Sequence, residues 1–337
     1  MSGEDNRFIG ETPLNEIVDK PAGGKQNVIL DATVLTSFMT CPRLTDFKYN
    51  HHFQSIKGKS NSLECGLIVH KFLEIYYQSM ILGVDKQKAF GFGMAAAELY
   101  VRSCADCTGF IATPENPKPV CGHKPNDYPG LQNTPAENEG YKIGWKWALT
   151  TCEQYHEHYR NDHWVPLEVE TVKGKVLYED DDLRVLWKAK LDWIVDTNQG
   201  IFPVDHKTMK QRRQTTKLNN QFKGQCLVMG TRNVIINKVG FQQSLKPVDK
   251  FERPPVSYSA AALTEWYSET LPFYAKMLLM YAEMDYYPPN YSNCEGKYGL
   301  CVFKDVCESD PAMREEELRN NFIVGPAWNP TNDDSED

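Results

Sequence analysis

The chain contains no apolar run that approaches the ~20 residues a membrane-spanning helix needs. Its first 30 residues have no apolar core and carry Glu4, Asp5, Glu11, Glu16 and Asp19, so we expect no secretory signal peptide. An excess of positive charge is also missing, because the formal net charge is −8, and this argues against indiscriminate coating of nucleic acid. We therefore expect a cytoplasmic protein with no membrane partner.

The chain is rich in apolar residues and in cysteine. Its 337 residues are 41% apolar, which is enough for one large α/β domain or two smaller ones. Ten cysteines in a cytosolic protein indicate metal binding or free thiols before disulfides.

The central stretch of the sequence predicts a β-hairpin. Two apolar runs rich in β-branched and aromatic residues, 183–195 and 201–204, flank the turn-forming residues Thr197-Asn198-Gln199-Gly200. Side chains alternate along a strand. Asp205 and Lys207 should therefore share one face of the second strand, while His206 points to the other.

A carboxylate on the first strand of this hairpin, Asp192, should lie close to Asp205 and Lys207. Two carboxylates beside an ammonium can hold a hard divalent cation through oxygen and steer a water molecule. Strand-end charges at a solvent edge give the same short pattern by chance. Both interpretations remain open on these residues alone.

An amphipathic helix is predicted over 64–76. Gly66, His70 and Glu74 follow one another at four-residue spacing on one of its faces. His70 is either a ligand or a histidine satisfied inside the core, and we interpret Glu74 as structural.

The remaining periodicity predicts further helices and strands. Gln221 and Gln225 lie one turn apart on one of the helices. The helices cover 86–102, 136–160, 218–229 and 260–284, the last bent near Pro272, and the strands cover 167–176 and 234–241.

Three segments depart from this regular pattern. We expect a flexible arm over 1–30 and an acidic tail over 311–337. Residues 103–135 are proline-rich, which forbids long regular elements, so they form an insertion. Its Cys104, Cys107, Cys121 and His123 could form a zinc knuckle that stabilises the loop, with free thiols as the alternative.

A basic run follows the hairpin directly. It contains Lys207, Lys210, Arg212, Arg213 and Lys217. Such a run is usually a solvated loop, but beside a metal site it could also hold phosphates.

Cysteines gather again near the end of the chain. Cys294, Cys301 and Cys307 lie within fourteen residues, one short of a four-thiolate site, so such a site needs a distant fourth ligand. Cys41 stands at a predicted helix end before Pro42, where a thiol is either a partly exposed ligand or a core residue.

In this order, the motifs resemble the RecB-like PD-(D/E)XK superfamily of iron–sulfur nucleases. That group includes CRISPR-associated adaptation exonucleases, the AddB-type nuclease domain and phage-encoded relatives. The motifs are Ser37, Phe38, Cys41-Pro42-Arg43 and Tyr49, then Gly66-x3-His70, Asp192, Asp205-x-Lys207 and Gln221. The chain departs from the group where Gln225 replaces the tyrosine of its Gln-x3-Tyr motif, and in the six-residue interval between Cys294 and Cys301.

The resemblance implies a PD-(D/E)XK restriction-endonuclease-like core over 31–310, a mixed central sheet flanked by helices. It implies that His70, Asp192, Asp205 and the backbone carbonyl of His206 bind Mg²⁺ or Mn²⁺. Lys207 would orient and help deprotonate the attacking water. Gln221 would contact the nucleic acid or support Lys207.

The resemblance further implies that Cys41, Cys294, Cys301 and Cys307 ligate a [4Fe–4S] cluster joining the amino- and carboxy-terminal regions, with zinc as the alternative occupant. The expected activity is a metal-dependent DNA exonuclease acting on single strands or duplex ends, with a phage recombination or CRISPR-adaptation protein as a partner. One alternative is a non-catalytic iron–sulfur DNA-binding scaffold. Another is a zinc-stabilised interaction protein without nucleic acid.

Overall fold

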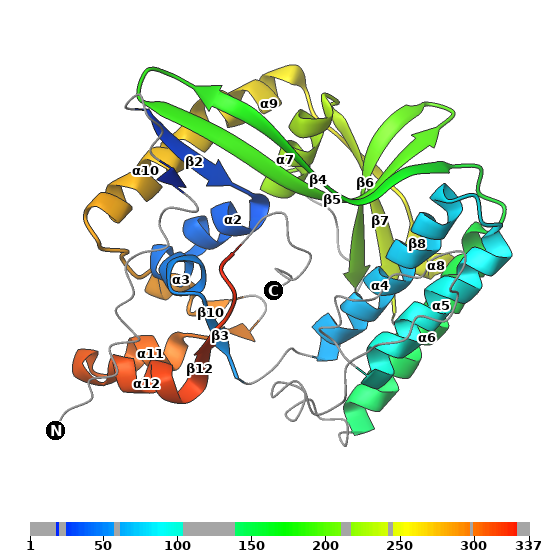
Figure 1. Cartoon of the computed structure of the whole chain (residues 1–337), viewed down its shortest axis with the longest axis horizontal. Helices are drawn as coiled ribbons and strands as arrows, with labels where there is room; N and C mark the ends of the chain where they lie inside the picture. The colour runs from blue at the N-terminus through cyan, green and yellow to red at the C-terminus, as the bar shows by residue number, and fades with distance from the viewer. Residues whose placement is uncertain are drawn as a thin grey trace. The chain divides into compact units, whose positions relative to one another are not determined.

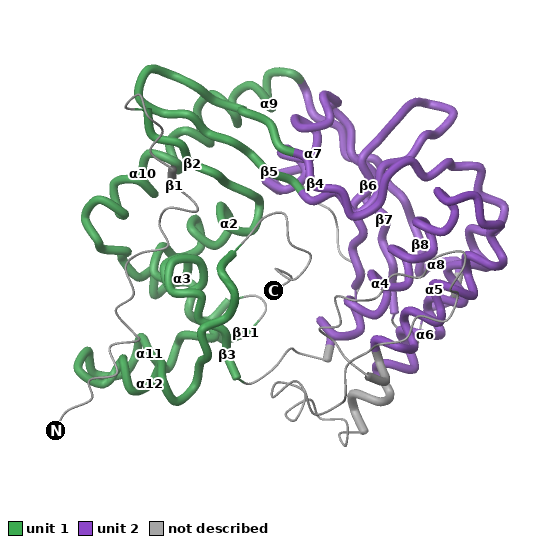
Figure 2. The backbone as a smooth tube through the Cα atoms, viewed as in Figure 1, with its two compact units in different colours: residues 1–56, 174–189, 260–330 green, residues 57–173, 190–259, 331–337 purple. Residues whose placement is uncertain are grey.

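A computed structural model of the chain describes residues 18–19, 25–56, 61–103, 139–209, 217–241, 245–296 and 299–328. The chain divides into two compact units (Figure 2). Unit 1 comprises residues 1–56, 174–189 and 260–330, and unit 2 comprises residues 57–173, 190–259 and 331–337. Strands β4 (Val165–Glu179) and β5 (Leu183–Thr197) each contribute one part to each unit.

Unit 2 is built on a mixed sheet. The second part of β5 pairs antiparallel with β6 (Gly200–Met209), from Trp193 opposite Val204 to Thr197 opposite Gly200. Strand β6 pairs parallel with β7 (Asn233–Gly240), which pairs antiparallel with β8 (Phe251–Glu252) and β9 (Pro255–Ser257). The predicted hairpin around Asn198 is thus confirmed.

Three helices pack beside these strands (Figure 1): α4 (Asn61–Ile81), α5 (Lys86–Ser103) and α6 (Glu139–Tyr159). Their apolar faces and the sheet form one core, in which Phe72, Tyr155 and Trp193 are fully buried. Helix α7 (Asn220–Met229) follows β6 and packs on β6 and β7. It begins at an Asn219 cap and ends at Gly230, whose φ of 66° lies in the left-handed region that glycine adopts without steric cost. The predicted α/β class, with a mixed central sheet flanked by helices, is confirmed.

Unit 1 contains the two ends of the described chain. Strand β1 (Val18–Asp19) pairs with β2 (Gln26–Leu30), which runs parallel to the first part of β5. Helix α2 (Ala32–Thr40) begins at an Asp31 cap and stops at Cys41 before Pro42. Then come α3 (Pro42–Thr45), the π-turn η1 (Asp46–Asn50) and β3 (Phe53–Ser55).

The carboxy-terminal part of unit 1 is mostly helical. The predicted 260–284 helix consists of α9 (Ala260–Glu265), a π-helical turn η3 (Trp266–Thr270) and α10 (Leu271–Glu283), so the irregularity lies directly before Pro272. Short elements follow: η4 (Tyr291–Asn293), β10 (Glu295–Gly296), β11 (Gly299–Leu300), α11 (Lys304–Glu308), η5 (Pro311–Met313), α12 (Arg314–Asn321) and β12 (Phe322–Val324).

Two predicted segment boundaries need correction. Residues 26–30 belong to a sheet and not to a flexible arm, because β2 finds a partner in β5. Residues 314–324, expected in an acidic tail, form α12 and β12. Phe322 of β12 is buried against Phe303 and Phe53 of the same unit, and β12 pairs with β3. Local charge alone did not reveal these tertiary partners.

Candidate metal centre

Three side chains from three elements of unit 2 converge: His70 from α4, Glu170 from β4 and Asp192 from β5. A ligand atom of each lies within 4.8 Å of a ligand atom of both others. Two carboxylates and one imidazole are donors suited to Mg²⁺, Mn²⁺ or a similar divalent cation.

Gly66 explains how α4 brings His70 to the sheet. A Cβ atom added at Gly66 would lie 2.8 Å from Oγ1 of Thr208 on β6, which is closer than real side chains approach. Glycine therefore allows the helix to pack closely against the strand that carries Asp205 and Lys207. His70 follows one turn later on the same face.

Glu170 is the residue that the sequence analysis missed. It lies on a strand that also carries Glu168, so the sequence alone did not single it out. Its φ of 51° places the backbone in the left-handed region, which is uncommon for a glutamate within a strand. Nζ of Lys190 lies 2.9 Å from Oε2 of Glu170.

The two carboxyls of this group disfavour ionisation. Burial, followed by the nearby charge of Asp192, raises the pKa of Glu170 to about 8. Burial, followed by the charge of Asp205, raises the pKa of Asp192 to about 6. Groups that repel each other in this way are relieved by a bound cation. Cation binding here should consequently release protons.

Asp205 and Lys207 lie on one face of β6, as alternation predicts. Nζ of Lys207 is 2.7 Å from Oδ2 of Asp205, which is fully buried. Lys207 also donates to Oε1 of Gln221 at 2.9 Å, and Nε2 of Gln221 donates to Oδ1 of Asp205 at 2.8 Å. The sequence-predicted pair and Gln221 are therefore brought together, while Asp205 lies outside the tight group of His70, Glu170 and Asp192.

His206 contacts Asp192 through its backbone and packs its ring in the core of unit 2. Its backbone N–H donates to Oδ2 of Asp192 at 2.6 Å. Its ring, 5.8 Å from that of His70, stacks on Tyr77 at 6.2 Å. Burial lowers the pKa of His206 well below the usual range, so the ring stays neutral. The ligand role of its carbonyl oxygen stays a prediction.

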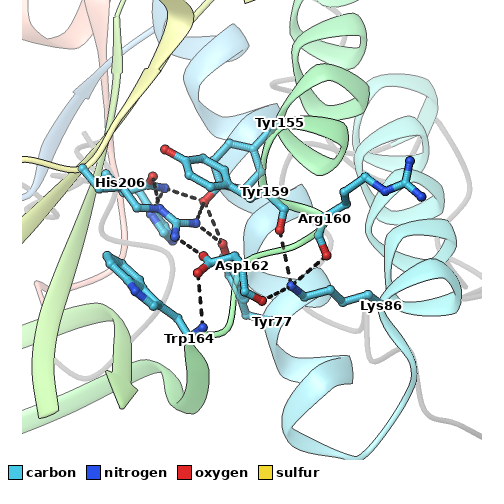
Figure 3. Close-up of polar contacts among 10 residues, drawn as sticks. Tyr77, Lys86, Tyr155, Tyr159, Arg160, Asp162, Trp164 and His206 are labelled. Atoms are coloured by element: carbon cyan, nitrogen blue, oxygen red, sulfur yellow. Dashed lines mark hydrogen bonds and ion pairs between the residues drawn. The ribbon is translucent and has the colours of Figure 1, made fainter. Parts of the chain in front are cut away.

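A buried polar network supports this ring (Figure 3). Nδ2 of Asn237 on β7 donates to the hydroxyl of Tyr155 at 2.9 Å and contacts Nδ1 of His206 at 2.8 Å. Nε of Arg253 donates to Oδ1 of Asn237 at 3.2 Å, which orients the amide. Because Nδ2 can only donate, Nδ1 of His206 accepts.

Arg253 is the centre of that network. Its guanidinium forms an ion pair with Asp162, donates to the hydroxyls of Tyr77 and Tyr155, and lies 3.6 Å from the ring centroid of Tyr159. Lys86 closes the same region by donating to the carbonyls of Tyr159, Arg160 and Asp162 at 2.5–3.3 Å, at the end of α6 (Figure 3). The start of α5 and the end of α6 are thereby linked to the segment between β8 and β9.

A second candidate site lies within unit 1. Cys41, Cys294, Cys301 and Cys307 all line one cavity of about 240 Å³. The backbone N–H of Asn290 donates to Sγ of Cys41 at 3.2 Å. Burial, followed by the neighbouring cysteines, raises the pKa values of Cys294 and Cys301. The sequence-predicted set of four thiols is thus gathered around one space.

The spacing of these thiols bears on what they could hold. Among the residues that the structure describes, no three cysteine sulfurs lie within 4.8 Å of one another. A tetrahedral zinc site with Zn–S bonds of about 2.3 Å brings its sulfurs to about 3.8 Å. The described thiols therefore do not have the close spacing of a formed zinc site, and the occupant of the cavity stays a prediction.

Two predictions fall outside the described residues. One is the zinc knuckle of Cys104, Cys107, Cys121 and His123, and the other is the middle of the basic run, residues 210–216. Both stay predictions.

No family model matches the chain, and a search of curated proteins finds no significant match. Within the described part of the chain, no helix is both long and apolar enough to cross a membrane.

Proposed function

We propose that the protein is a metal-dependent DNA nuclease with a RecB-like PD-(D/E)XK core, acting as an exonuclease on single strands or duplex ends. The observation that carries the proposal is the convergence of His70, Glu170 and Asp192 beside the Asp205–Lys207 pair. In a purely structural cluster, cationic side chains would balance the buried carboxylates. The raised pKa values of Glu170 and Asp192 instead indicate negative charge that a bound cation would balance.

The residues divide the chemistry of phosphodiester hydrolysis among them. Mg²⁺ or Mn²⁺, when bound, supplies positive charge against the phosphate oxygens. His70, Glu170, Asp192 and Asp205 would hold that ion. Lys207 would orient the attacking water, and its positive charge would favour loss of the water's proton to solvent as the new P–O bond forms, while the ester bond breaks and the leaving oxygen takes a proton from solvent.

The proposal is tested by incubating end-labelled single- and double-stranded DNA with the purified protein and Mn²⁺. We expect shortening of the labelled strands that stops when EDTA replaces Mn²⁺. The variant Asp205→Asn, purified in parallel, controls for a contaminating nuclease and should be inactive. Full activity in EDTA, or in the variant, would contradict the assignment of the site.

We also propose that Cys41, Cys294, Cys301 and Cys307 hold a [4Fe–4S] cluster. Soft thiolates suit iron–sulfur clusters, and the four thiols surround one cavity. Such a cluster would tie α2 to the α11 region within unit 1. Since the linked cysteines are far apart in sequence, it would remove much entropy from the unfolded chain.

Metal analysis of anaerobically purified protein tests the cluster. We expect iron and sulfide in equal amounts, about four of each per chain, and a brown colour that the double variant Cys301→Ser/Cys307→Ser lacks. Zinc without sulfide would instead show that zinc, the alternative occupant, is bound at the four cysteines.

A non-catalytic DNA-binding scaffold is the second candidate. It is favoured by one observation, namely that Gln225 stands where the resembled superfamily carries a tyrosine. DNA binding without hydrolysis, in the presence of Mn²⁺, would select this candidate.

A further inference from the structure

Gln225 lies on α7, one turn after Gln221, and its side chain is only 1% exposed. A group so buried cannot contact a nucleic acid directly. Its Nε2 donates to Oδ1 of Asp205 at 3.0 Å, beside the 2.8 Å hydrogen bond from Gln221 to the same oxygen. Two amides therefore converge on one carboxylate oxygen from consecutive turns of one helix.

The two glutamines differ in what else they contact. Oε1 of Gln221 accepts a hydrogen bond from Lys207, so Gln221 joins the carboxylate to the lysine. Among the residues that the structure describes, Oε1 of Gln225 is buried and accepts no hydrogen bond. Within that part of the chain, Gln225 thus reaches the site through its hydrogen bond to Asp205.

We propose that Gln225 is a positioning residue for the cation: it commits Oδ1 of Asp205 to amide donors and so keeps Oδ2 turned toward Lys207 and the metal position. This inference rests on the proposed nuclease function. A carboxylate held by two fixed donors loses little rotational freedom when it binds a cation. Without Gln225, the carboxylate would be held by Gln221 and Lys207 only.

The two glutamines should therefore differ in which measured quantity they affect, the cation affinity or the rate of the chemical step. Loss of Gln225 should weaken cation binding, because the ligand oxygen is less well oriented. Loss of Gln221 should in addition slow the chemical step, because Lys207 loses its partner. A merely structural role for Gln225 would lower stability without this difference.

Gln225→Met is a well-matched variant for the test. Methionine has a similar length, and it removes the buried oxygen that lacks a partner, which offsets part of the lost hydrogen bond. We expect the Mn²⁺ concentration for half-maximal DNA hydrolysis to rise roughly 10-fold to 100-fold, as when the supports of other metal ligands are removed. The rate at saturating Mn²⁺ should fall by a smaller factor. Gln221→Met should likewise raise the Mn²⁺ concentration for half-maximal hydrolysis, and it should also lower the rate at saturating Mn²⁺ strongly, because Lys207 loses its partner.

Direct Mn²⁺ binding, followed by the electron paramagnetic resonance signal of the free ion, gives a readout independent of activity. Gln87→Met, the same change at an exposed position of α5, is the control and should bind Mn²⁺ as the wild type does. If Gln225→Met does not fold, Gln225→Leu serves the same purpose. Thermal unfolding of each variant without metal reports any loss of fold.

The outcomes distinguish this inference from the function on which it rests. Wild-type protein that neither binds Mn²⁺ nor cuts DNA would overturn the proposed function. Active wild-type protein with Gln225→Met binding Mn²⁺ equally tightly would overturn the positioning role alone. Weaker binding by Gln225→Met, with Gln87→Met unchanged, supports it.

Discussion

Replacing Lys207 by methionine should lower the rate of DNA hydrolysis at saturating Mn²⁺ by roughly 10² to 10⁴, the usual contribution of a positioned acid–base group. The ammonium lies 2.7 Å from Oδ2 of Asp205 and donates to Gln221 at 2.9 Å, so its position is fixed from two sides. Its side chain is 38% exposed, which leaves it accessible to a water molecule and a phosphate. Steady-state cleavage of a labelled oligonucleotide measures the effect.

The matched control for this variant is Lys173→Met. Lys173 lies on β4 in the same unit, and its ammonium pairs with Glu168 at 2.8 Å near the surface. Surface pairs of this kind contribute about 1 kcal/mol or less to stability, and we expect the cleavage rate to stay close to that of the wild type. Equal losses in both variants would mean that general positive charge, and not the placement of Lys207, supports catalysis.

Replacing Arg253 by methionine should destabilise unit 2 by about 3–5 kcal/mol, the cost of removing one partner from a buried charged pair. The Arg253 side chain is 7% exposed, and its loss leaves Asp162, which is 17% exposed, without its cation. Three further acceptors, the hydroxyls of Tyr77 and Tyr155 and Oδ1 of Asn237, lose a donor. Urea unfolding, with hydrogen exchange of α6 peptides to follow unit 2, measures the effect.

Arg160→Met provides the comparison. Arg160 pairs with Glu157 at 3.1 Å, but both side chains are more than half exposed, and in Figure 3 the Arg160 side chain points away from the network. Its loss should cost about 0.5 kcal/mol or less. Adding Asp162→Asn to Arg253→Met should cost less than the sum of the two single changes, because the two side chains share one interaction. Strict additivity would show that the pair is not coupled.

The predictable part of the fold is the part that local pattern controls. Alternation of apolar residues around Asn198 predicted the β5–β6 hairpin, and it placed Asp205 and Lys207 on one face. Helical periodicity predicted α4, α5, α6 and α7, with ends within five residues of the observed ones. These features depend on neighbours in the sequence, so the sequence is sufficient to predict them.

The candidate site was predictable only where its residues lie on such elements. His70, Asp192 and Gln221 were found through spacing and resemblance, whereas Glu170 was not. The pairing of β4 with β5, together with the left-handed backbone at Glu170, brings that carboxylate to Asp192. Neither feature leaves a signal in the local sequence.

By itself, the sequence determined the class of secondary structure, the hairpin and the chemical types available for a metal centre, because short-range periodicity specifies which face each side chain occupies. Only the tertiary structure decided that Glu170 joins His70 and Asp192, that Gln225 is buried against Asp205, and that four separated cysteines line one cavity. Those contacts join residues far apart in the chain. Their distances are set by strand pairing and by the packing of helices on the sheet, which no local pattern encodes.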